Sequence, residues 1–262
     1  MKNSAKLIAH YTSFRVACEH LLPERRIRFS PLANMNDPRE NRERMVGVGW
    51  SGDDTPALDE RTAASDKLKT AYRDYSKVFC GTLDGENPNN LNTKRCFGRP
   101  RMWAQYADNH RGICLLFNRD KLDLEIQAAV QGDACLYSGE VVYDDYLKHV
   151  SAAACDLDFD QVREVGQEAA LRKQVDTYHR ALFLRKDSDW IGESEYRWVI
   201  HRWERGHEFV PFDESLESIV MGVDCPEVYI PTIMEQAHGR PVFRLEWDSE
   251  MEDFYTRELA AP

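Results

Sequence analysis

One stretch, WIGESEYRWVIHRW at residues 190–203, constrains the fold of this chain more than any other. Its residues alternate with the two-residue period of a β-strand, so Glu193, Glu195 and Arg197 share one predicted face. The opposite face is aromatic and aliphatic, as expected of a strand that packs on a core. The stretch therefore predicts a strand of a sheet, with two carboxylates and a guanidinium in a row on one side.

The two carboxylates of this strand require an explanation. Like charges that lie about 7 Å apart on one strand face repel each other, and neighbouring aromatic residues limit their solvation. Either Arg197 neutralises an ordinary solvated face, or Glu193 and Glu195 belong to a binding or catalytic site, where perturbed charges gather. The strand by itself leaves both explanations open.

The composition is that of a folded globular protein and limits its partners. With 262 residues and 42% hydrophobic content the chain is able to bury a core, and we expect one elaborated domain over residues 1–262. The net charge of −11 argues against a large binding surface for duplex nucleic acid. It leaves open the recognition of a nucleotide or of one exposed base.

The cysteines and the apolar runs indicate a compartment. The seven cysteines are scattered, odd in number and form no CxxC pair, which is typical of reduced thiols in the cytoplasm. No apolar run approaches the roughly 18 residues of a membrane span, and the N-terminal residues contain no apolar region of signal length. We therefore expect a soluble, cytoplasmic protein with no membrane partner and leave its oligomeric state open.

Several common catalytic motifs are missing from the sequence. It contains no HExxH, no Walker loop, no GxGxxG after a strand, no GxSxG and no His/Cys cluster at zinc spacing. No metal site is therefore predicted, although ligands dispersed along the sequence stay open.

The hydrophobic pattern predicts strands and helices that alternate irregularly. The chain opens with a strand at 6–12, a helix that Ser13 caps and Pro23 ends, and a strand at 26–30. Further strands are predicted at residues 78–83, 112–118, 136–144, 207–212, 216–222 and 241–247, with an edge strand at 254–260. Further helices are predicted at residues 58–77 (solvent-exposed), 102–110, 150–184 and 226–237, and a long loop at 84–100. This order indicates a mixed α+β fold rather than repeating βα units.

Two short motifs early in the chain carry candidate site residues. His10, Tyr11 and Thr12 end the first predicted strand, where a lone histidine is more often structural than functional. Asn36 and Asp37 precede a proline, and such residues usually form a turn by bonding to their own backbone.

A third motif lies on the predicted helix at 102–110. Trp103 and Tyr106 share a helix face, and His110 follows four residues later. An aromatic stripe at this spacing is more often part of a core than of a ligand site. The segment nevertheless leads into a strand, and helix-to-strand junctions are places where ligands bind.

Taken together, these motifs support a family resemblance. In order, they are His10-Tyr11-Thr12, Ile27-Arg28-Phe29-Ser30, Asn36-Asp37-Pro38 with Glu40, Met102-Trp103-x-x-Tyr106-Ala107-x-Asn109-His110-x-Gly112-x-Cys114, and Trp190-x-x-Glu193-x-Glu195-Tyr196-Arg197. The chain resembles a widespread bacterial family known only as domain of unknown function 2971, over roughly residues 8–222. The set of motifs is specific although each member alone is weak.

The opening of the chain also looks like the start of ADP-ribosyltransferase folds. It is similar to the branch that holds the DNA-modifying toxin DarT and the RNA 2′-phosphotransferases. This resemblance implies a split mixed β-sheet core with flanking and inserted helices. In such folds a first-strand histidine contacts the NAD ribose, aromatic residues enclose the nicotinamide, and a glutamate on a later strand completes the site.

The same resemblance implies a role for each candidate. The first-strand histidine and its neighbour would be His10 and Thr12, and the late-strand glutamate would be Glu195 or Glu193, with a narrow preference for Glu195. Tyr106 or Tyr11 would lie against the nicotinamide. Arg197 would hold a glutamate side chain or a diphosphate bidentately. The remaining residues expected around NAD are Arg28, Ser30, Asn36, Asp37, Trp103 and His110.

The implied function is that of an NAD-dependent ADP-ribosyltransferase, with NAD as substrate and a nucleic acid or protein as acceptor. A fixed carboxylate suits this chemistry because the glycosidic bond breaks through a cationic, oxocarbenium-like centre. A role as a toxin or phage-defence effector fits this activity. Two alternatives stay open, namely a nucleotide- or partner-binding module in stress or defence and an RNA-end phosphotransferase or nuclease.

Two expectations test this assignment. His10, Tyr106 and Glu195 should face one pocket, because groups more than about 15 Å apart do not share a pocket of ordinary volume. The substitution Glu195→Gln should abolish activity and change the melting temperature by only a few degrees if the residue is not structural.

Overall fold

The computed structural model describes residues 6–42, 46–52, 55–85, 92–145 and 154–260. It contains a large mixed β-sheet accompanied by helices, which confirms the predicted α+β class. Residues 86–91 of the predicted loop and residues 150–153 of a predicted helix lie outside the described part of the chain.

Within the described residues, ten strands form one sheet and the remaining strands form two separate pairs. The sheet strands are β1 (Leu7–Thr12), β2 (Arg26–Pro31), β4 (Ser76–Leu83), β5 (Ile113–Asn118), β6 (Cys135–Glu140), β10 (Glu195–His201), β11 (Glu208–Pro211), β12 (Leu216–Met221), β13 (Val242–Asp248) and β14 (Asp253–Glu258). The separate pairs are β3 (Gly47–Gly49) with β8 (Asp156–Asp158) and β7 (Val142–Tyr143) with β9 (Arg185–Lys186). The sheet is mixed because β12 and β13 are parallel, whereas β1, β4, β5 and β10 pair antiparallel.

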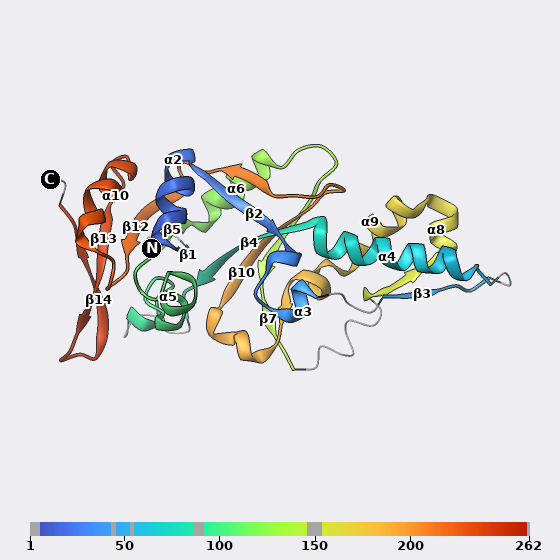
Figure 1. Cartoon of the computed structure of the whole chain (residues 1–262), viewed down its shortest axis with the longest axis horizontal. Coiled ribbons are helices and arrows are strands. Elements are labelled where there is room, and N and C mark those ends of the chain that lie inside the picture. The colour runs from blue at the N-terminus through green and yellow to red at the C-terminus, as the bar shows by residue number, and fades with distance from the viewer. Residues whose placement is uncertain (1–5, 43–45, 53–54, 86–91, 146–153, 261–262) are drawn as a thin grey trace, which may run out of the picture.

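Helices gather at both ends of the molecule. The α-helices are α1 (Phe14–Val16), α2 (Leu22–Glu24), α3 (Pro38–Asn41), α4 (Leu58–Asp74), α5 (Pro100–Tyr106), α6 (Arg119–Ala129), α8 (Phe159–Val165), α9 (Gln167–Phe183) and α10 (Ile230–Gln236). Shorter turns are the π-helix η1 (Ala17–Leu21) and the 3₁₀ turns η2 (Leu32–Asn34), η3 (Asn92–Lys94), η4 (Ser188–Glu193) and η5 (Glu227–Tyr229). Figure 1 shows α4, α8 and α9 at one end, and α10 with β13 and β14 at the other.

The sheet divides along one edge of β4. On this edge Val78 pairs with Ser30 of β2, and Thr82 pairs with Ala9 of β1. The residues between them, 79–81, pair with neither strand, whereas β10 follows the opposite edge of β4 from end to end. The separation of β1 from β2 therefore opens the sheet beside the middle of β4.

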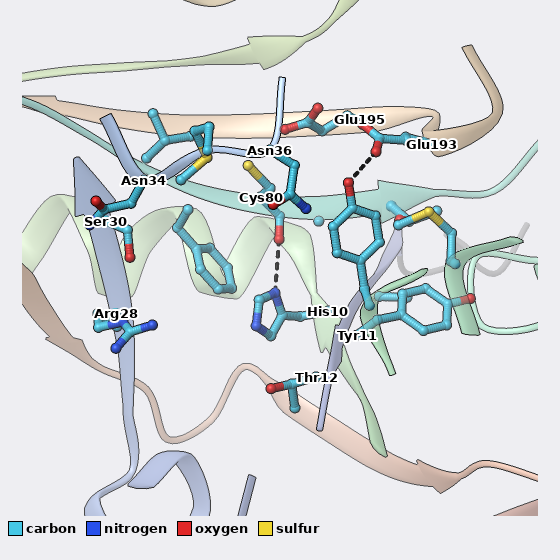
Figure 2. Close-up of a pocket in the computed structure, with 18 of the residues that line it drawn as sticks. His10, Tyr11, Thr12, Arg28, Ser30, Asn34, Asn36, Cys80, Glu193 and Glu195 are labelled. Carbon is cyan, nitrogen blue, oxygen red and sulfur yellow. Dashed lines mark hydrogen bonds between the residues drawn. The ribbon is translucent and has the colours of Figure 1, made fainter. Parts of the chain in front are cut away.

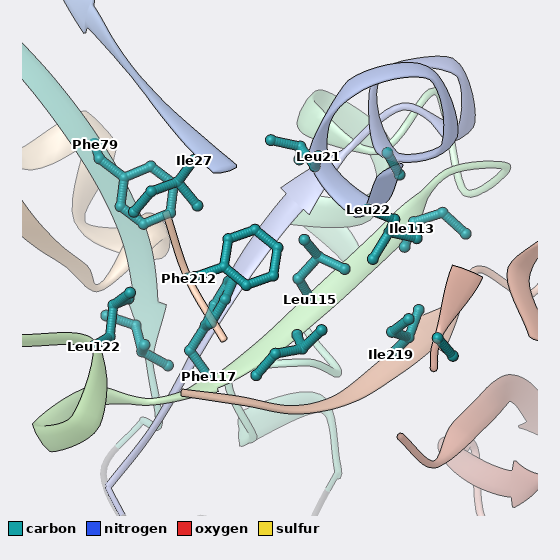
Figure 3. Close-up of a cluster of buried hydrophobic side chains, with 14 of the residues drawn as sticks. Leu21, Leu22, Ile27, Phe79, Ile113, Leu115, Phe117, Leu122, Phe212 and Ile219 are labelled. Atoms are coloured by element: carbon teal, nitrogen blue, oxygen red, sulfur yellow. The ribbon is translucent and has the colours of Figure 1, made fainter. Parts of the chain in front are cut away.

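Apolar clusters cover both faces of the central strand β5. Ile113, Leu115 and Phe117 point into the cluster that Figure 3 shows, together with side chains from η1, β2 and β12. The alternate residues Cys114 and Leu116 belong to a second cluster on the other face. A strand buried on both faces explains why this part of the sequence is continuously apolar.

The stretch at 190–203 departs from the predicted single strand. Its first residues form η4, whose N-terminus is capped by Asp187, and Ser194 then adopts a left-handed conformation with φ of 43°. The strand β10 begins only at Glu195, so the prediction that Glu193 lies on the same strand face is wrong. The alternative of a solvated face is also wrong, because Glu195 and Arg197 are 5% and 0% exposed.

Other predicted boundaries were wrong for local reasons. The predicted helix at 150–184 is interrupted by Gly166, whose φ of 84° is left-handed, and becomes α8 and α9. Pro23 does not end the first helical segment but lies in the first turn of α2, which begins at Leu22, and the chain leaves the helix at the left-handed Arg25. Helix α6 was not predicted. Helix α4 ends at Asp74, before the predicted residue 77, and it is less exposed than predicted because it buries Leu68 and other side chains.

Candidate functional site

A cavity of about 370 Å³ occupies the opening between β1, β2 and β4. The predicted site residues that line it are His10, Tyr11, Thr12, Arg28, Ser30, Asn36, Tyr106, Glu193 and Glu195. The expectation that His10, Tyr106 and Glu195 face one pocket is therefore met in the structure. Figure 2 shows the cavity with His10 near its centre and the two glutamates together at one end.

Two of the expected site residues are buried near the cavity and do not line it. Asp37 does not line the cavity; it is 2% exposed and accepts a hydrogen bond from the backbone N–H of Arg39, at 2.8 Å, as the cap of α3. Arg197 does not line it either, and its guanidinium is fully buried behind Glu195.

Two expected residues on and after α5 also lie outside the cavity lining. Trp103 is fully buried in the second apolar cluster, and its Nε1–H donates to the carbonyl of Phe97 at 2.7 Å. His110 follows the end of α5 in a left-handed turn with φ of 68°, so it does not continue the helical face of Tyr106. The aromatic pattern at 103–110 therefore contributes one residue, Tyr106, to the cavity.

The glutamate end of the cavity is built around an ionic network that we call the carboxylate cluster. Its members are Glu40, Lys186, Glu193, Glu195 and Arg197. Lys186 Nζ lies 2.6 Å from Oε2 of Glu193 and 2.8 Å from Oε2 of Glu195. The two carboxylates are only 3% and 5% exposed. Glu193 ends η4 and Glu195 begins β10, and Lys186 contacts the side chains of both.

Arg197 uses its whole guanidinium within the protein. Its Nε and Nη2 donate to the two carboxylate oxygens of Glu195 at 2.6 and 3.1 Å. Its Nη1 and Nη2 donate to the two oxygens of Glu40, and Nη1 also donates to the carbonyl of Phe183 at 2.8 Å. A guanidinium has five N–H groups, so none is left for a ligand. Of the two roles expected for Arg197, it holds a glutamate and does not bind a diphosphate.

The surroundings of Glu195 keep it ionised. Burial alone would raise the pKa of this carboxyl, but the charges of Arg197 and Lys186 lower the pKa to about 2. Burial opposes the charge of Lys186, and the neighbouring carboxylates outweigh it and raise the lysine pKa. Glu195 is therefore a fixed negative charge over the whole physiological range of pH.

The two glutamates differ in the hydrogen-bonding capacity that remains. A carboxylate accepts about four hydrogen bonds. Glu195 receives two from Arg197, one at each oxygen, and its Oε2 also forms an ion pair with Lys186 Nζ at 2.8 Å. Glu193 receives one from Lys186 and one from the hydroxyl of Tyr106. Each oxygen of Glu193 thus retains a position at which a ligand is able to donate.

His10 presents a neutral imidazole to the cavity. Its Nδ1 lies 3.0 Å from the carbonyl oxygen of Cys80, which only accepts, so Nδ1 carries the proton. Burial and, more weakly, the positive charge of Arg28 lower the pKa of His10. The other nitrogen, Nε2, is then an acceptor suited to a hydroxyl group. The ring also packs on Phe79, with 4.6 Å between centroids.

Arg28 gives the cavity a cationic end. It is exposed on β2 and forms no ion pair with any residue in the described ranges. In Figure 2 it lies beyond His10, away from Glu193 and Glu195. The two ends of the cavity therefore differ in chemistry: the guanidinium of Arg28 lies at one end, and Glu193 and Glu195 lie at the other.

Two charged residues of the site were not predicted as site residues. Lys186 and Glu40 both line the cavity, and both are buried members of the carboxylate cluster. Glu40 follows Asn36 in one of the sequence motifs on which the predicted resemblance rests, which was the available signal for it. Lys186 lies in the short strand β9 and belongs to no motif, so its role depends on a contact that only the folded chain creates.

Two further findings concern metals and membranes. Among the described residues, no group of three His, Cys, Asp or Glu side chains is placed to hold a metal ion. In the same part of the chain, no helix is both long and apolar enough to cross a membrane.

Comparison with known proteins gives one match. No curated protein and no solved structure matches the chain. Residues 102–198 match the model of a family described as "Protein of unknown function (DUF2971)", a range that contains Tyr106, Lys186, both glutamates and Arg197. This match confirms the predicted resemblance to the family of unknown function 2971 over that range.

Proposed function

We propose that the cavity binds NAD as a substrate and that the protein transfers its ADP-ribose to an acceptor with release of nicotinamide. The observation that carries the proposal is the pair of buried glutamates at the end of the cavity. Arg197 holds Glu195 as a fixed charge, and Glu193 beside it keeps free acceptor positions.

The polarity of the cavity supports a ligand of this kind. NAD carries an anionic diphosphate and several ribose hydroxyls. Arg28 offers a cation for the diphosphate, and the acceptor nitrogen of His10 suits a ribose hydroxyl. Ligand sites typically measure about 300–1,000 Å³, so the 370 Å³ of this cavity suits the nicotinamide riboside portion with the diphosphate at the exposed Arg28.

The two glutamates then have separate roles. The bond between ribose C1′ and the nicotinamide nitrogen breaks, and its electron pair leaves with nicotinamide, which becomes neutral. The permanent charge of Glu195 stabilises the cationic centre that develops at C1′. The acceptor forms a new bond to C1′, and Glu193 takes the proton that the acceptor loses. This division gives the proton transfer to Glu193, because Arg197 already donates to both oxygens of Glu195, whereas each oxygen of Glu193 keeps an acceptor position.

The biological setting belongs to the same proposal. A nucleic acid or a protein serves as acceptor, and the protein works in the bacterial cytoplasm as a toxin or phage-defence effector. Cys18, Cys80, Cys96, Cys114, Cys135 and Cys225 form no disulfide bond in the structure, as we expect of a protein in that compartment.

A second candidate is a nucleotide-binding module without turnover. The contacts of Glu195 with Arg197 and Lys186 favour it, since a carboxylate that two cations already hold contributes less to chemistry than one that faces substrate alone. Such a module would bind NAD or another nucleotide and release no nicotinamide.

The experiment uses NAD labelled in nicotinamide or in adenine, incubated with the protein and a bacterial lysate. We expect release of labelled nicotinamide and transfer of the adenine label to an acceptor, and neither with Glu193→Gln. Binding without release would favour the module. Equal release by the wild type and by folded Glu193→Gln would contradict the proposed role of the cavity.

A further inference from the structure

Glu40 joins the wall of the cavity to the strand that carries Glu195. It is 6% exposed and lies on the one-turn helix α3, directly after the loop whose Asn34, Met35 and Asn36 line the cavity. The loop is fastened locally, since Asn41 donates to the carbonyl of Met35 at 2.7 Å. Glu40 therefore has a fixed position relative to that wall.

The contact between Glu40 and Arg197 closes a ring of interactions around the glutamate end of the cavity. Asn36 and Tyr106 both line the cavity, and from Tyr106 the contacts run through Glu193, Lys186, Glu195 and Arg197 to Glu40. Asn36 and Glu40 lie four residues apart in one segment, whereas Glu40 and Arg197 are 157 positions apart in the sequence. The ring thus makes the loop, α5, β9 and β10 depend on one another.

The charged groups of the ring depend on one another for their hydrogen bonds. The ring holds three carboxylates and two cations in a buried place, and Arg197 divides its donors between Glu40 and Glu195. Without the carboxylate of Glu40, the Nη1 and Nη2 groups of Arg197 would lose two acceptors inside the protein. A buried donor without a partner is costly, so the guanidinium would shift to find others. Glu195, which Arg197 holds through both oxygens, would move with it.

We infer that Glu40 is a positioning residue that acts on the reaction through Arg197 and Glu195. The inference rests on the proposed NAD chemistry. It assigns Glu40 an effect on the transition state rather than on substrate affinity, because Glu195 acts mainly on the charge that develops at ribose C1′.

The test compares turnover of NAD by the wild type, Glu40→Gln and Glu40→Asp. Misplacement of a catalytic group by about 1 Å costs up to about a hundredfold in rate. We therefore expect kcat of Glu40→Gln to fall roughly tenfold to a hundredfold, with KM for NAD within about threefold of the wild type. Glu40→Asp keeps the charge but is one methylene shorter, so its kcat should lie between the two.

Glu208→Gln is the matched control. Glu208 also pairs with a buried cation, Lys77 at 3.4 Å, but it does not line the cavity, so kcat should be unchanged. Melting curves identify the folded variants, and Glu40→Asp decides if Glu40→Gln does not fold.

Four results overturn the inference. A folded Glu40 variant with wild-type kcat shows that the residue only supports the fold, and so does failure of both variants to fold. A rise of KM alone shows that Glu40 shapes substrate binding instead. If the wild type itself does not turn over NAD, the proposed function fails and the inference fails with it. The wild-type measurement therefore distinguishes failure of the proposed function from failure of the inference alone.

Discussion

The strands β4 and β10 carry buried polar side chains at both of their ends, and the two ends differ in what those side chains face. At one end Glu195 and Arg197 belong to the carboxylate cluster, and Glu195 lines the cavity. At the other end Ser76, Lys77 and His201 are 0%, 1% and 3% exposed and do not line that cavity. Burial of polar groups is therefore common to both ends and does not by itself mark a site.

The hydrogen bonds explain the difference. At the second end Ser76 and His201 bond to each other at 3.0 Å, and Lys77 is paired with Glu208. At the first end Glu193 retains acceptor positions that face the cavity, although it also bonds to Lys186. The buried Nε2 of His201 also has no hydrogen-bond partner among the described residues, but it does not face the cavity. An unused hydrogen-bonding position therefore marks a candidate site only where it lies beside open space.

The largest expected effect is on the rate of catalysis, and a substitution should cause it only at the end of β4 and β10 that faces the cavity. Glu193→Gln removes the proposed proton acceptor, and loss of a general base typically costs about 10²–10⁴ in rate. We expect this decrease in the rate of nicotinamide release from NAD. Glu208→Gln, the corresponding change at the other end, should keep the wild-type rate; a similar loss in both variants would show that the two ends do not differ in function.

The next effect concerns stability at the carboxylate cluster. Glu195→Gln leaves Arg197 and Lys186 with one carboxylate fewer in a buried place, and breaking such a pair costs about 3–5 kcal/mol. Melting temperature should fall by roughly ten degrees. This revises the change of only a few degrees that follows when Glu195 is treated as an ordinary site residue. A variant that melts with the wild type would show that Glu195 does not hold the cluster together.

The other end of β4 and β10, which carries His201, should affect how the stability of the protein depends on pH. Burial lowers the pKa of His201 from 6.5 to about 4. Between these values the unfolded chain takes up a proton at this residue and the folded protein does not, so stability falls as the pH drops from about 6.5 to 4. The loss approaches about 3 kcal/mol. Urea unfolding of His201→Asn should show a flatter dependence over this range, and an unchanged slope would contradict the assignment.

The smallest effect concerns the cationic end of the cavity. Arg28→Gln removes an exposed charge that we place at the diphosphate, and KM for NAD should rise about tenfold. Arg26→Gln is the matched control, because Arg26 is exposed on the same strand and does not line the cavity. Equal values of KM in the two variants would remove Arg28 from the site.

Local patterns in the sequence predicted much of the fold. The apolar runs at the first strand and at residues 112–118 predicted β1 and β5, and the cap at Ser13 is present in the structure. Backbone changes that depend on one residue were missed, such as the left-handed Ser194 that ends η4. That change removed Glu193 from the predicted strand face.

The site was less predictable because long-range contacts define it. His10, Tyr106 and Glu195 reach one cavity through strand pairing and through the division of the sheet beside β4. Lys186 and Glu40 acquire their roles only when β9 and α3 meet β10. The contact of Glu40 with Arg197 spans 157 positions, and no local pattern predicts it. Lys186 is only seven residues from Glu193, but the turn η4 between them, which no pattern predicted, is what brings them together.

The central claim is that the cavity recognises NAD. Calorimetric titration of the wild-type protein with NAD tests it most directly, with Arg28→Gln and Arg26→Gln measured alongside. The account predicts saturable binding that Arg28→Gln weakens about tenfold and Arg26→Gln leaves unchanged. Absence of binding at millimolar NAD, or equal binding by both variants and the wild type, would contradict it.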